Sequence, residues 1–386
     1  MQTISLSTLS YPTELLFTCL AGFSICVAAF PSYISWIKQK QIRQYVRDDG
    51  PKSHAHKDKT PTAGGVVFTL LIPMLTPVLW WLFGMKIEIW HLLPLATGLV
   101  CGGIGFVDDF AKVMSQSNKG ISGYVRFGLE LGCGFFIGAL LVAFNHHILY
   151  VPFANIFQSV FGGAVDAQST GHFLSAWVPA PAFFILISGF IVAACANAFN
   201  LHDGMDGLSA GTGCQVFASI ALILSFYGTA FIQYAVIAAC VAGSLCAFLV
   251  FNRYPAKIFM GDTGSLFIGG LMGAIVLCGG MVFLFIPLSL IYIVEALSVI
   301  SQVVYFKLTK KMEGEENLPL FKVVFVKLTK KLPGQGKRLF RMAPIHHHFE
   351  AVLQEKGVAE WQVVAMFWFV QALISTFVVV TTFTLN

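Results

Sequence analysis

The sequence predicts an all-α, polytopic membrane protein with about ten transmembrane helices, and three observations lead to this class. Of the 386 residues, 56% are hydrophobic and 11% are charged, whereas soluble domains carry about 25% charged residues. The mean hydropathy is +0.76. The apolar residues also gather in runs of about 20, the length that an α-helix needs to cross a bilayer.

Ten such runs follow one another and predict a single integral membrane domain over residues 1–386. Prolines interrupt several runs, which membrane helices tolerate where neighbouring helices satisfy the freed backbone groups. No basic segment precedes the first run, so we expect no cleavable signal peptide. The nine cysteines lie singly and favour small buried residues over disulfides. The runs lie near 15–37, 63–83, 91–108, 126–145, 181–199, 208–228, 230–251, 264–281, 283–306 and 360–382.

Every lysine and arginine except Lys86 falls on one side of the predicted membrane. With ten spans, that side includes the segments 38–59, 109–126, 252–263 and 307–356. Basic residues collect in cytoplasmic loops of membrane proteins, so this side is predicted to be cytoplasmic. Both termini are then predicted to face outward.

Two adjacent carboxylates, Asp108 and Asp109, stand at the end of the third run in "GFVDDFAK". An ionised acid near hydrocarbon costs about 3 kcal/mol or more, so such an acid usually lines a pathway or a site. A helix turns about 100° per residue, so one acid could ligate a cation while the other faces a substrate. A solvated pair at a helix end is the simpler alternative. Lys112 could pair with Asp109 at i+3 spacing.

Three further motifs on the same side carry acids and glycines. "FMGDTGS" places glycines around Asp262 just before a helix, an arrangement suited to phosphate, although a glycine turn with a helix cap is the alternative. "NLHDGMDG" carries Asp203 and Asp206 but lacks the ligand spacing of a calcium loop. The third motif, "DGPKSHAHKDKTPTAGG", joins the first two spans.

Histidines cluster at two places. His346, His347 and His348 are consecutive, so they cannot all face one ion, and phosphate or sugar recognition is favoured over zinc. His146 and His147 begin the predicted outer loop 146–180; they could bind a metal, but a solvated or interfacial pair is favoured.

Five polar loops, far apart in sequence, thus share one predicted membrane face. Acids that hold a divalent cation, lysines and glycine-rich turns are the parts needed to bind a diphosphate and stabilise phosphoryl transfer. All-oxygen ligands suit Mg²⁺. A site at the membrane surface allows one substrate to be soluble and the other to be a lipid. The lysines in question are Lys57, Lys112 and Lys119.

From about Val46 to the last span, the chain resembles the phospho-N-acetylmuramoyl-pentapeptide transferase family of the polyprenyl-phosphate N-acetylhexosamine-1-phosphate transferase superfamily. The resemblance rests on "DGPKSH", "TPTAGG", "GFVDDFAKV", "NAFNLHDGMDGL", "FNRYPAKIFMGDTGSL" and "RMAPIHHH". It implies transfer of phospho-MurNAc-pentapeptide from UDP-MurNAc-pentapeptide to undecaprenyl phosphate, giving lipid I and UMP. It also implies Mg²⁺, a homodimer, no nucleic-acid partner, and the bacterial cytoplasmic (inner) membrane.

The resemblance also implies roles for individual residues. Asp262, Asp108 and Asp109 resemble the metal and phosphate site, and these three with His346 are the catalytic candidates. Whether the lipid phosphate attacks directly or an aspartate forms a covalent intermediate stays open, with direct attack favoured. The residues carried over to the nucleotide-sugar pocket are Lys57, Thr62, Lys112, Asn197, Asn200, Asp203, Asp206, Asn252, Phe259, Gly261 and His347.

The chain departs from the family pattern in several places. Lys59 replaces a glycine, His202 replaces a threonine, and Tyr124 replaces a basic residue, so no role is assigned to Arg126 nearby. A cytoplasmic insertion, 307–338, contains "KLTKK" twice. It could be a small duplication that forms a basic, partly apolar element on the membrane surface, or a plain variable loop.

One further acid and two rival functions remain. Glu295 lies deep in the ninth run and is predicted to face the bundle interior, in a hydrogen bond between helices rather than in catalysis. A transporter is the rival from another class, but transporters place their sites near the midplane. A related transferase that acts on UDP-GlcNAc is the closer rival.

Overall fold

The computed structural model describes residues 11–40, 60–115, 120–152, 154–165, 174–312, 315, 318–330 and 332–385. Within these ranges ten helices are long and apolar enough to cross a membrane, which confirms the predicted class. These helices are α1 (Pro12–Gln39), α2 (Gly65–Leu82), α3 (Leu93–Ser115), α4 (Gly123–Ala143), α6 (Pro181–His202), α7 (Leu208–Phe226), α8 (Ile232–Asn252), α9 (Gly261–Cys278), α11 (Leu290–Leu308) and α14 (Glu360–Leu385).

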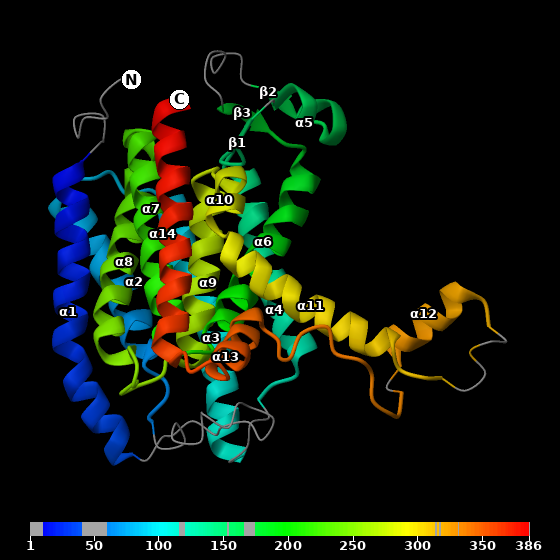
Figure 1. Cartoon of the computed structure of the whole chain (residues 1–386). Helices are drawn as coiled ribbons and strands as arrows, with labels where there is room; N and C mark the ends of the chain where they lie inside the picture. Colours follow the sequence, from blue (N-terminus) through cyan, green and yellow to red (C-terminus); the bar gives the residue numbers. More distant parts are fainter. Residues whose placement is uncertain are drawn as a thin grey trace.

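Two helices differ from their predicted runs. The third does not end at the acid pair, because α3 continues about two turns beyond Asp108. The ninth run is divided at Ser289 into the short helix α10 (Val282–Leu288) and α11. Pro287 lies just before this division, and a proline has no N–H to continue the hydrogen-bond ladder. The division lets α11 take a direction of its own, oblique to the bundle (Figure 1).

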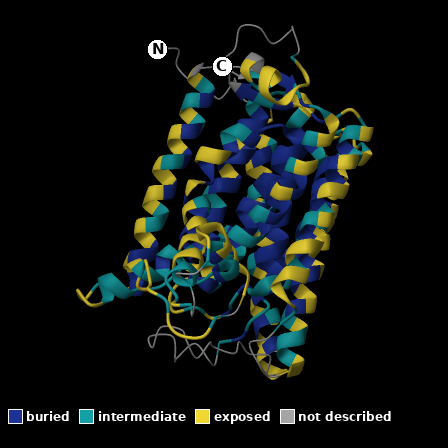
Figure 2. Cartoon of the chain, turned by 90° about the vertical axis from the view of Figure 1, so that its right-hand side faces the viewer, coloured by how far each residue is buried: buried dark blue, intermediate teal, exposed yellow. Residues whose placement is uncertain are grey.

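The centre of the bundle is α9, and the other spans surround it. All of its residues from Thr263 to Cys278 are buried, and Figure 2 shows this buried interior among exposed outer helices. Glycines allow α3 to approach very closely. A Cβ at Gly105 would lie only 2.2 Å from the carbonyl oxygen of Asp262. This packing fixes the end of α3 against the beginning of α9.

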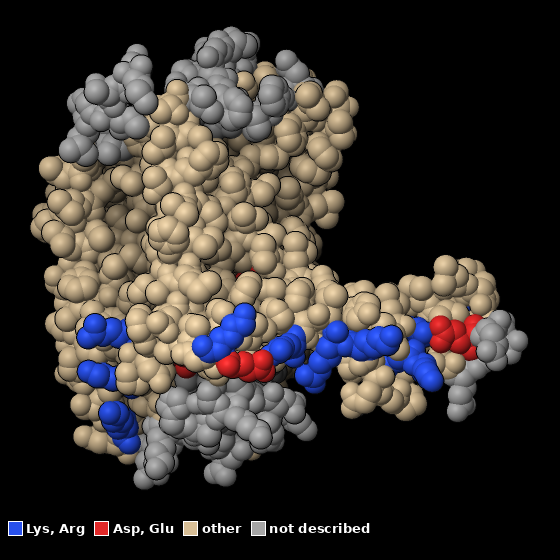
Figure 3. All heavy atoms as spheres, in the orientation of Figure 1, with Lys and Arg blue, Asp and Glu red and all other residues tan. Residues whose placement is uncertain are grey.

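The two ends of the bundle are different. One end carries α5 (Ala154–Phe161) and an antiparallel sheet in the order β1–β3–β2, with the C-terminus nearby (Figure 1). The strands are β1 (Leu149–Pro152), β2 (Ala164–Val165) and β3 (Leu174–Val178). The other end carries α13 (Ile345–Gln354) and, at the far end of α11, α12 (Leu320–Thr329). Lys and Arg side chains gather at the level of that second end (Figure 3).

Candidate active site

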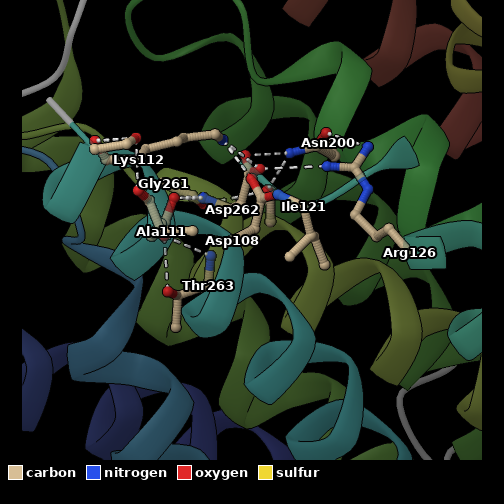
Figure 4. A network of polar contacts seen from close by, with 12 residues as sticks. Asp108, Ala111, Lys112, Ile121, Arg126, Asn200, Gly261, Asp262 and Thr263 are labelled. Carbon is tan, nitrogen blue, oxygen red and sulfur yellow. Dashed lines mark hydrogen bonds and ion pairs between the residues drawn. The ribbon is translucent and has the colours of Figure 1, made fainter. Parts of the chain in front are cut away.

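Five polar side chains from four helices meet where α3 ends against α9, and we call them the carboxylate centre (Figure 4). The Nζ atom of Lys112 lies 2.6 Å from Oδ2 of Asp108 and 2.7 Å from Oδ2 of Asp262. Asn200, from α6, donates its Nδ2 to Oδ1 of Asp262 at 2.9 Å. Arg126, from α4, donates Nη1 to Oδ2 of Asp262 at 3.3 Å. Asp262 is therefore the hub of the centre.

Asp109 points away from its neighbour, as the geometry of a helix requires. Its Oδ1 accepts a hydrogen bond from the backbone N–H of Asp262 at 3.1 Å. Its Oδ2 accepts from the N–H and the hydroxyl of Thr263, at 2.9 and 2.7 Å. The two backbone N–H groups belong to the first turn of α9 and have no acceptor within that helix. Asp109, which belongs to α3, therefore caps the N-terminus of α9. The predicted pairing of Lys112 with Asp109 is wrong, because Lys112 contacts Asp108 instead.

The backbone at Gly120 and Ile121 lies close against Asp108. The backbone N–H of Ile121 donates to Oδ1 of Asp108 at 2.7 Å. At Gly120, an added Cβ would lie 2.1 Å from the same oxygen. Only glycine fits there without moving the carboxylate, so the segment after α3 holds Asp108 in its orientation.

Two charged residues of α4 belong to this site although the sequence had given them no role. Arg126 also donates Nη2 to Oδ1 of Asn197 at 3.3 Å. Glu130 is fully buried, accepts a hydrogen bond from Nδ2 of Asn197, and lies 3.8 Å from Nε of Arg126. The signal that could have found them is the i,i+4 spacing of an arginine and a glutamate inside an apolar run.

The "TPTAGG" and "FMGD" loops are joined by backbone hydrogen bonds. Phe259 donates to the carbonyl of Pro61 at 2.9 Å, and Gly64 donates to the carbonyl of Phe259 at 2.8 Å. Thr62 lies between these bonds and is half-buried. Gly261 has a φ of +76°, which favours glycine, at the step from this loop into α9. Lys57 lies outside the described residues.

Two of the predicted pocket residues, Asn252 and Asp206, are buried and connect loops. Asn252 accepts from the N–H of Gly207 and donates to the carbonyl of Ile258, both at 3.0 Å. Asp206 accepts from the N–H of Ala256 at 2.9 Å. Both residues are 2% exposed, so the structure shows them joining the turn after α6 to the loop before α9.

Asp203 follows the last residue of α6 and accepts a hydrogen bond from the hydroxyl of Ser209. Burial raises the pKa of the Asp203 carboxyl to about 7, and the Ser209 hydroxyl partly offsets this effect. This carboxyl therefore changes charge near neutral pH.

A second polar group, the histidine cluster, consists of His202, Glu295 and His346. Nδ1 of His202 lies 3.3 Å and Nδ1 of His346 lies 3.0 Å from the two oxygens of Glu295. All three side chains are fully buried, and their ligand atoms lie within 4.8 Å of one another. The predicted interhelical role of Glu295 is confirmed. His347 lies beside the cluster and contacts Glu350 at 2.9 Å.

The carboxylate centre has a donor set that fits a divalent cation. One oxygen of Asp108 and one of Asp262 converge on a single ammonium group, and carboxylate oxygens are the ligands that Mg²⁺ prefers. Asp109 is different, because both of its oxygens already accept hydrogen bonds from α9. Of the three predicted metal ligands, Asp108 and Asp262 therefore lie together at Lys112. Asp109 instead contacts the backbone of the first turn of α9.

Comparisons with known proteins identify the relatives of this chain. A family model described as glycosyl transferase family 4 matches residues 91–280. The phospho-N-acetylmuramoyl-pentapeptide-transferase of Shouchella clausii is 36% identical over 92% of this chain and 94% of its own. The enzymes of that name from Bacillus subtilis and Acaryochloris marina are 34% and 35% identical, over 92% and 87% of this chain and 93% and 78% of their own.

The ten candidate spans and the named relatives thus define a multi-pass membrane transferase, which matches the glycosyl transferase family 4 model over residues 91–280. The similarity extends over more than nine-tenths of the chain and reaches well outside the part that the family model matches. The chain belongs to the phospho-N-acetylmuramoyl-pentapeptide-transferase family, and it is a protein of the bacterial cytoplasmic membrane.

Proposed function

We propose that this protein transfers phospho-MurNAc-pentapeptide from UDP-MurNAc-pentapeptide to undecaprenyl phosphate. An oxygen of the lipid phosphate attacks the phosphorus that carries the sugar, a new P–O–P linkage forms, and the bond to UMP breaks. The products are lipid I and UMP. The observation that carries this proposal is the convergence of Asp108, Asp262, Lys112 and Arg126 at the N-terminus of α9.

The charges of this centre suit a diphosphate. Lys112 and Arg126 supply two positive charges, and the first turn of α9 adds the positive end of its helix dipole. Asn200 and Arg126 hold Asp262 from one side, so its carboxylate keeps one orientation. Preorganised charges of this kind stabilise the charge that develops during phosphoryl transfer.

We propose that Asp262 and Asp108 hold the divalent cation and that this cation is Mg²⁺. When bound, Mg²⁺ neutralises charge on the phosphate oxygens. Asp109 positions Asp262 through the first turn of α9 instead of holding the metal itself. Of the two histidines carried over, we propose that His346 supports the site through its contact with Glu295, and that the half-buried His347 contacts substrate.

Direct attack by the lipid phosphate is the route that we propose. The second pKa of a phosphate monoester is about 6, so the nucleophile is largely ionised at neutral pH and needs little base catalysis. Asp109 is poorly placed as a covalent nucleophile, because both oxygens accept hydrogen bonds. A phospho-sugar trapped on Asp108 or Asp109 would instead establish a covalent route.

A transfer assay tests the proposed function and its closest rival. Purified protein receives radiolabelled UDP-MurNAc-pentapeptide or UDP-GlcNAc together with undecaprenyl phosphate and Mg²⁺. Label should enter the lipid fraction from the first donor only, and a chelator should stop the transfer. Preference for UDP-GlcNAc would assign the chain to the rival reaction. Light scattering of the same detergent-solubilised sample tests the homodimer that we also propose for this family member.

We propose that the carboxylate centre faces the cytoplasm. Cysteines in place of Lys356 and Lys86, which are exposed at opposite ends of the bundle, test this orientation. An impermeant thiol reagent should label Lys356→Cys only from inside and Lys86→Cys only from outside. None of the nine native cysteines is exposed, so the background should be low. Labelling of both variants from the same side would overturn the ten-span arrangement.

A further inference from the structure

The duplicated "KLTKK" motif builds a defined element, which we call the arm: the end of α11, α12 and the segment 332–343. Lys307 of the first copy donates Nζ to the carbonyl of Leu328 in the second copy at 2.7 Å. Lys327 of the second copy donates Nζ to the carbonyl of Leu308 in the first at 3.1 Å. Each lysine thus satisfies a carbonyl in the last turn of the other helix. The two copies of the motif therefore contact each other reciprocally in the arm.

The arm encloses a groove of about 620 Å³ between α11 and α12. Its apolar part includes Val299, Val303, Phe306 and Met342. Its cationic part is lined by the side chains of Lys307, Lys310, Lys327, Lys330, Arg338 and Arg341. In the described part of the chain, two of these cations pair with carboxylates, Lys327 with Glu315 and Arg341 with Glu355. The groove therefore has an excess of positive charge beside an apolar wall.

The outer face of α12 is apolar and exposed. Leu320, Phe321 and Phe325 are 79%, 76% and 65% exposed. Val323 and Lys327 are buried, and Phe321 and Phe325 lie on the side of the helix away from them. Large apolar side chains that project from a cationic helix are typical of elements that lie in a membrane interface.

The position of the arm agrees with such an interface. It projects away from the bundle at the end of a membrane-spanning helix (Figure 1), and its Lys and Arg side chains continue the level of the basic residues on the bundle (Figure 3). Phosphate headgroups and acyl chains meet at this depth, so a ligand with an anionic head and an apolar tail would match both parts of the groove. The lining includes none of the five side chains of the carboxylate centre, and its one residue from α4 is Tyr124, two positions before Arg126.

We propose that the groove binds the phosphate headgroup of an anionic glycerophospholipid, while the apolar face of α12 inserts into the same leaflet. A glycerophospholipid is the source to which we commit, because the cations belong largely to the insertion and not to the transfer site. Its acyl chains would lie along the apolar wall formed by α11. The proposal is independent of the transferase reaction.

Native mass spectrometry of the full-length protein, released from nanodiscs of phosphatidylcholine with or without phosphatidylglycerol, tests this site. The groove variant Lys330→Ala/Arg338→Ala removes two exposed cations that line the groove. The matched control Lys322→Ala/Lys337→Ala removes two exposed cations of the same insertion that do not line it. Wild type and control should retain phosphatidylglycerol, and the groove variant should bind it at least about tenfold more weakly. Lys330→Arg/Arg338→Lys, which keeps both charges, should restore binding and shows that the site tolerates substitution.

Four results would overturn the proposal. Equal losses in the groove variant and the control would show attraction by general charge only. Equal retention of phosphatidylcholine and phosphatidylglycerol would show that the headgroup charge is not recognised. Displacement by stoichiometric undecaprenyl phosphate would assign the groove to the acceptor lipid, and displacement by millimolar inorganic phosphate would assign it to a free anion.

Discussion

The carboxylate centre and the histidine cluster both depend on the end of α6, yet they are built differently. Asn200 contributes to the first and His202 to the second. In the centre, Asp262 and Lys112 keep 17% and 30% of their side chains exposed. In the cluster, all three side chains are fully buried. One polar group is therefore open to a ligand, and the other is closed.

The difference separates a binding role from a structural one. The centre holds charged groups of both signs at its surface, which a soluble diphosphate and a cation can reach. The cluster sets one carboxylate between two imidazoles, and these residues come from α6, α11 and α13. The Glu295 carboxylate contacts both imidazoles, so we infer that the cluster fixes α13, and with it His347, beside the centre.

The largest effect should come from Asp262→Asn in the open centre. The amide lacks the charge that offsets the cation and the ammonium of Lys112. Removal of one preorganised charged group at a transition state costs about 10²–10³ in kcat. The transfer assay should show this loss while the melting temperature in detergent stays close to that of wild type. Near wild-type turnover at low Mg²⁺ would show that Asp262 does not hold the metal.

Substitution of the two neighbouring acids, Asp108 and Asp109, should affect activity and stability differently. Asp108→Asn should lose activity and keep its stability, whereas Asp109→Asn should lose activity together with about 1 kcal/mol of stability, because it caps α9. Activity and thermal unfolding are measured for both across pH 6–9. Thr263→Val removes the hydroxyl that donates a hydrogen bond to Asp109. It is the matched control and should reproduce part of the stability loss. Recovery of Asp109→Asn above neutral pH would favour a general base and contradict our assignment.

A smaller effect on turnover, but a clear effect on stability, should follow from Glu295→Gln in the closed cluster. Removal of one partner of a buried ion pair typically lowers the free energy of unfolding by about 3–5 kcal/mol. Glu355→Gln is the control, because Glu355 pairs with Arg341 at the exposed surface, where such a pair contributes little to stability. Thermal unfolding in detergent compares the two variants. Equal melting temperatures would show that the cluster does not support the fold.

The sequence predicted what depends on length and polarity, and it missed what depends on how helices rotate against each other. Ten spans and their basic ends follow from hydropathy and charge, and the structure has the ten helices. Asp108 and Asp262 were both candidates, but their shared contact with Lys112 requires the packing of α3 against α9. The i,i+4 spacing of Arg126 and Glu130 was visible in the sequence, but the contact of Glu130 with Asn197 on another helix was not.

The insertion and the ninth span show the same limit. The repeated "KLTKK" left a duplication and a variable loop open, and the reciprocal lysine contacts depend on how α12 folds back on α11. Pro287 was visible in the ninth run, yet membrane helices often continue through a proline. Neighbouring helices decide whether the helix bends or breaks, and these neighbours are not adjacent in sequence.

The smallest expected effect concerns Asp203, which follows the cluster residue His202 in the chain. Its folded pKa is raised to about 7, whereas an unfolded aspartate has a pKa of about 3.9. The folded state therefore keeps a proton that the unfolded state loses between these values. The contribution to stability is full below about pH 4 and is lost as the pH rises through about 7. The slope is at most about 1.4 kcal/mol per pH unit.

Asp203→Asn should remove this slope, so its melting temperature should fall less than that of wild type between pH 5 and pH 8. Ser209→Ala removes the hydroxyl that lowers the pKa of the Asp203 carboxyl, and it should move the wild-type decline to higher pH. Thermal unfolding in detergent at half-unit pH steps measures all three proteins. Parallel curves for wild type and Asp203→Asn would show that the carboxyl keeps an ordinary pKa. The Asp203 carboxyl would then be solvated in the folded protein, as the charged groups of the carboxylate centre are.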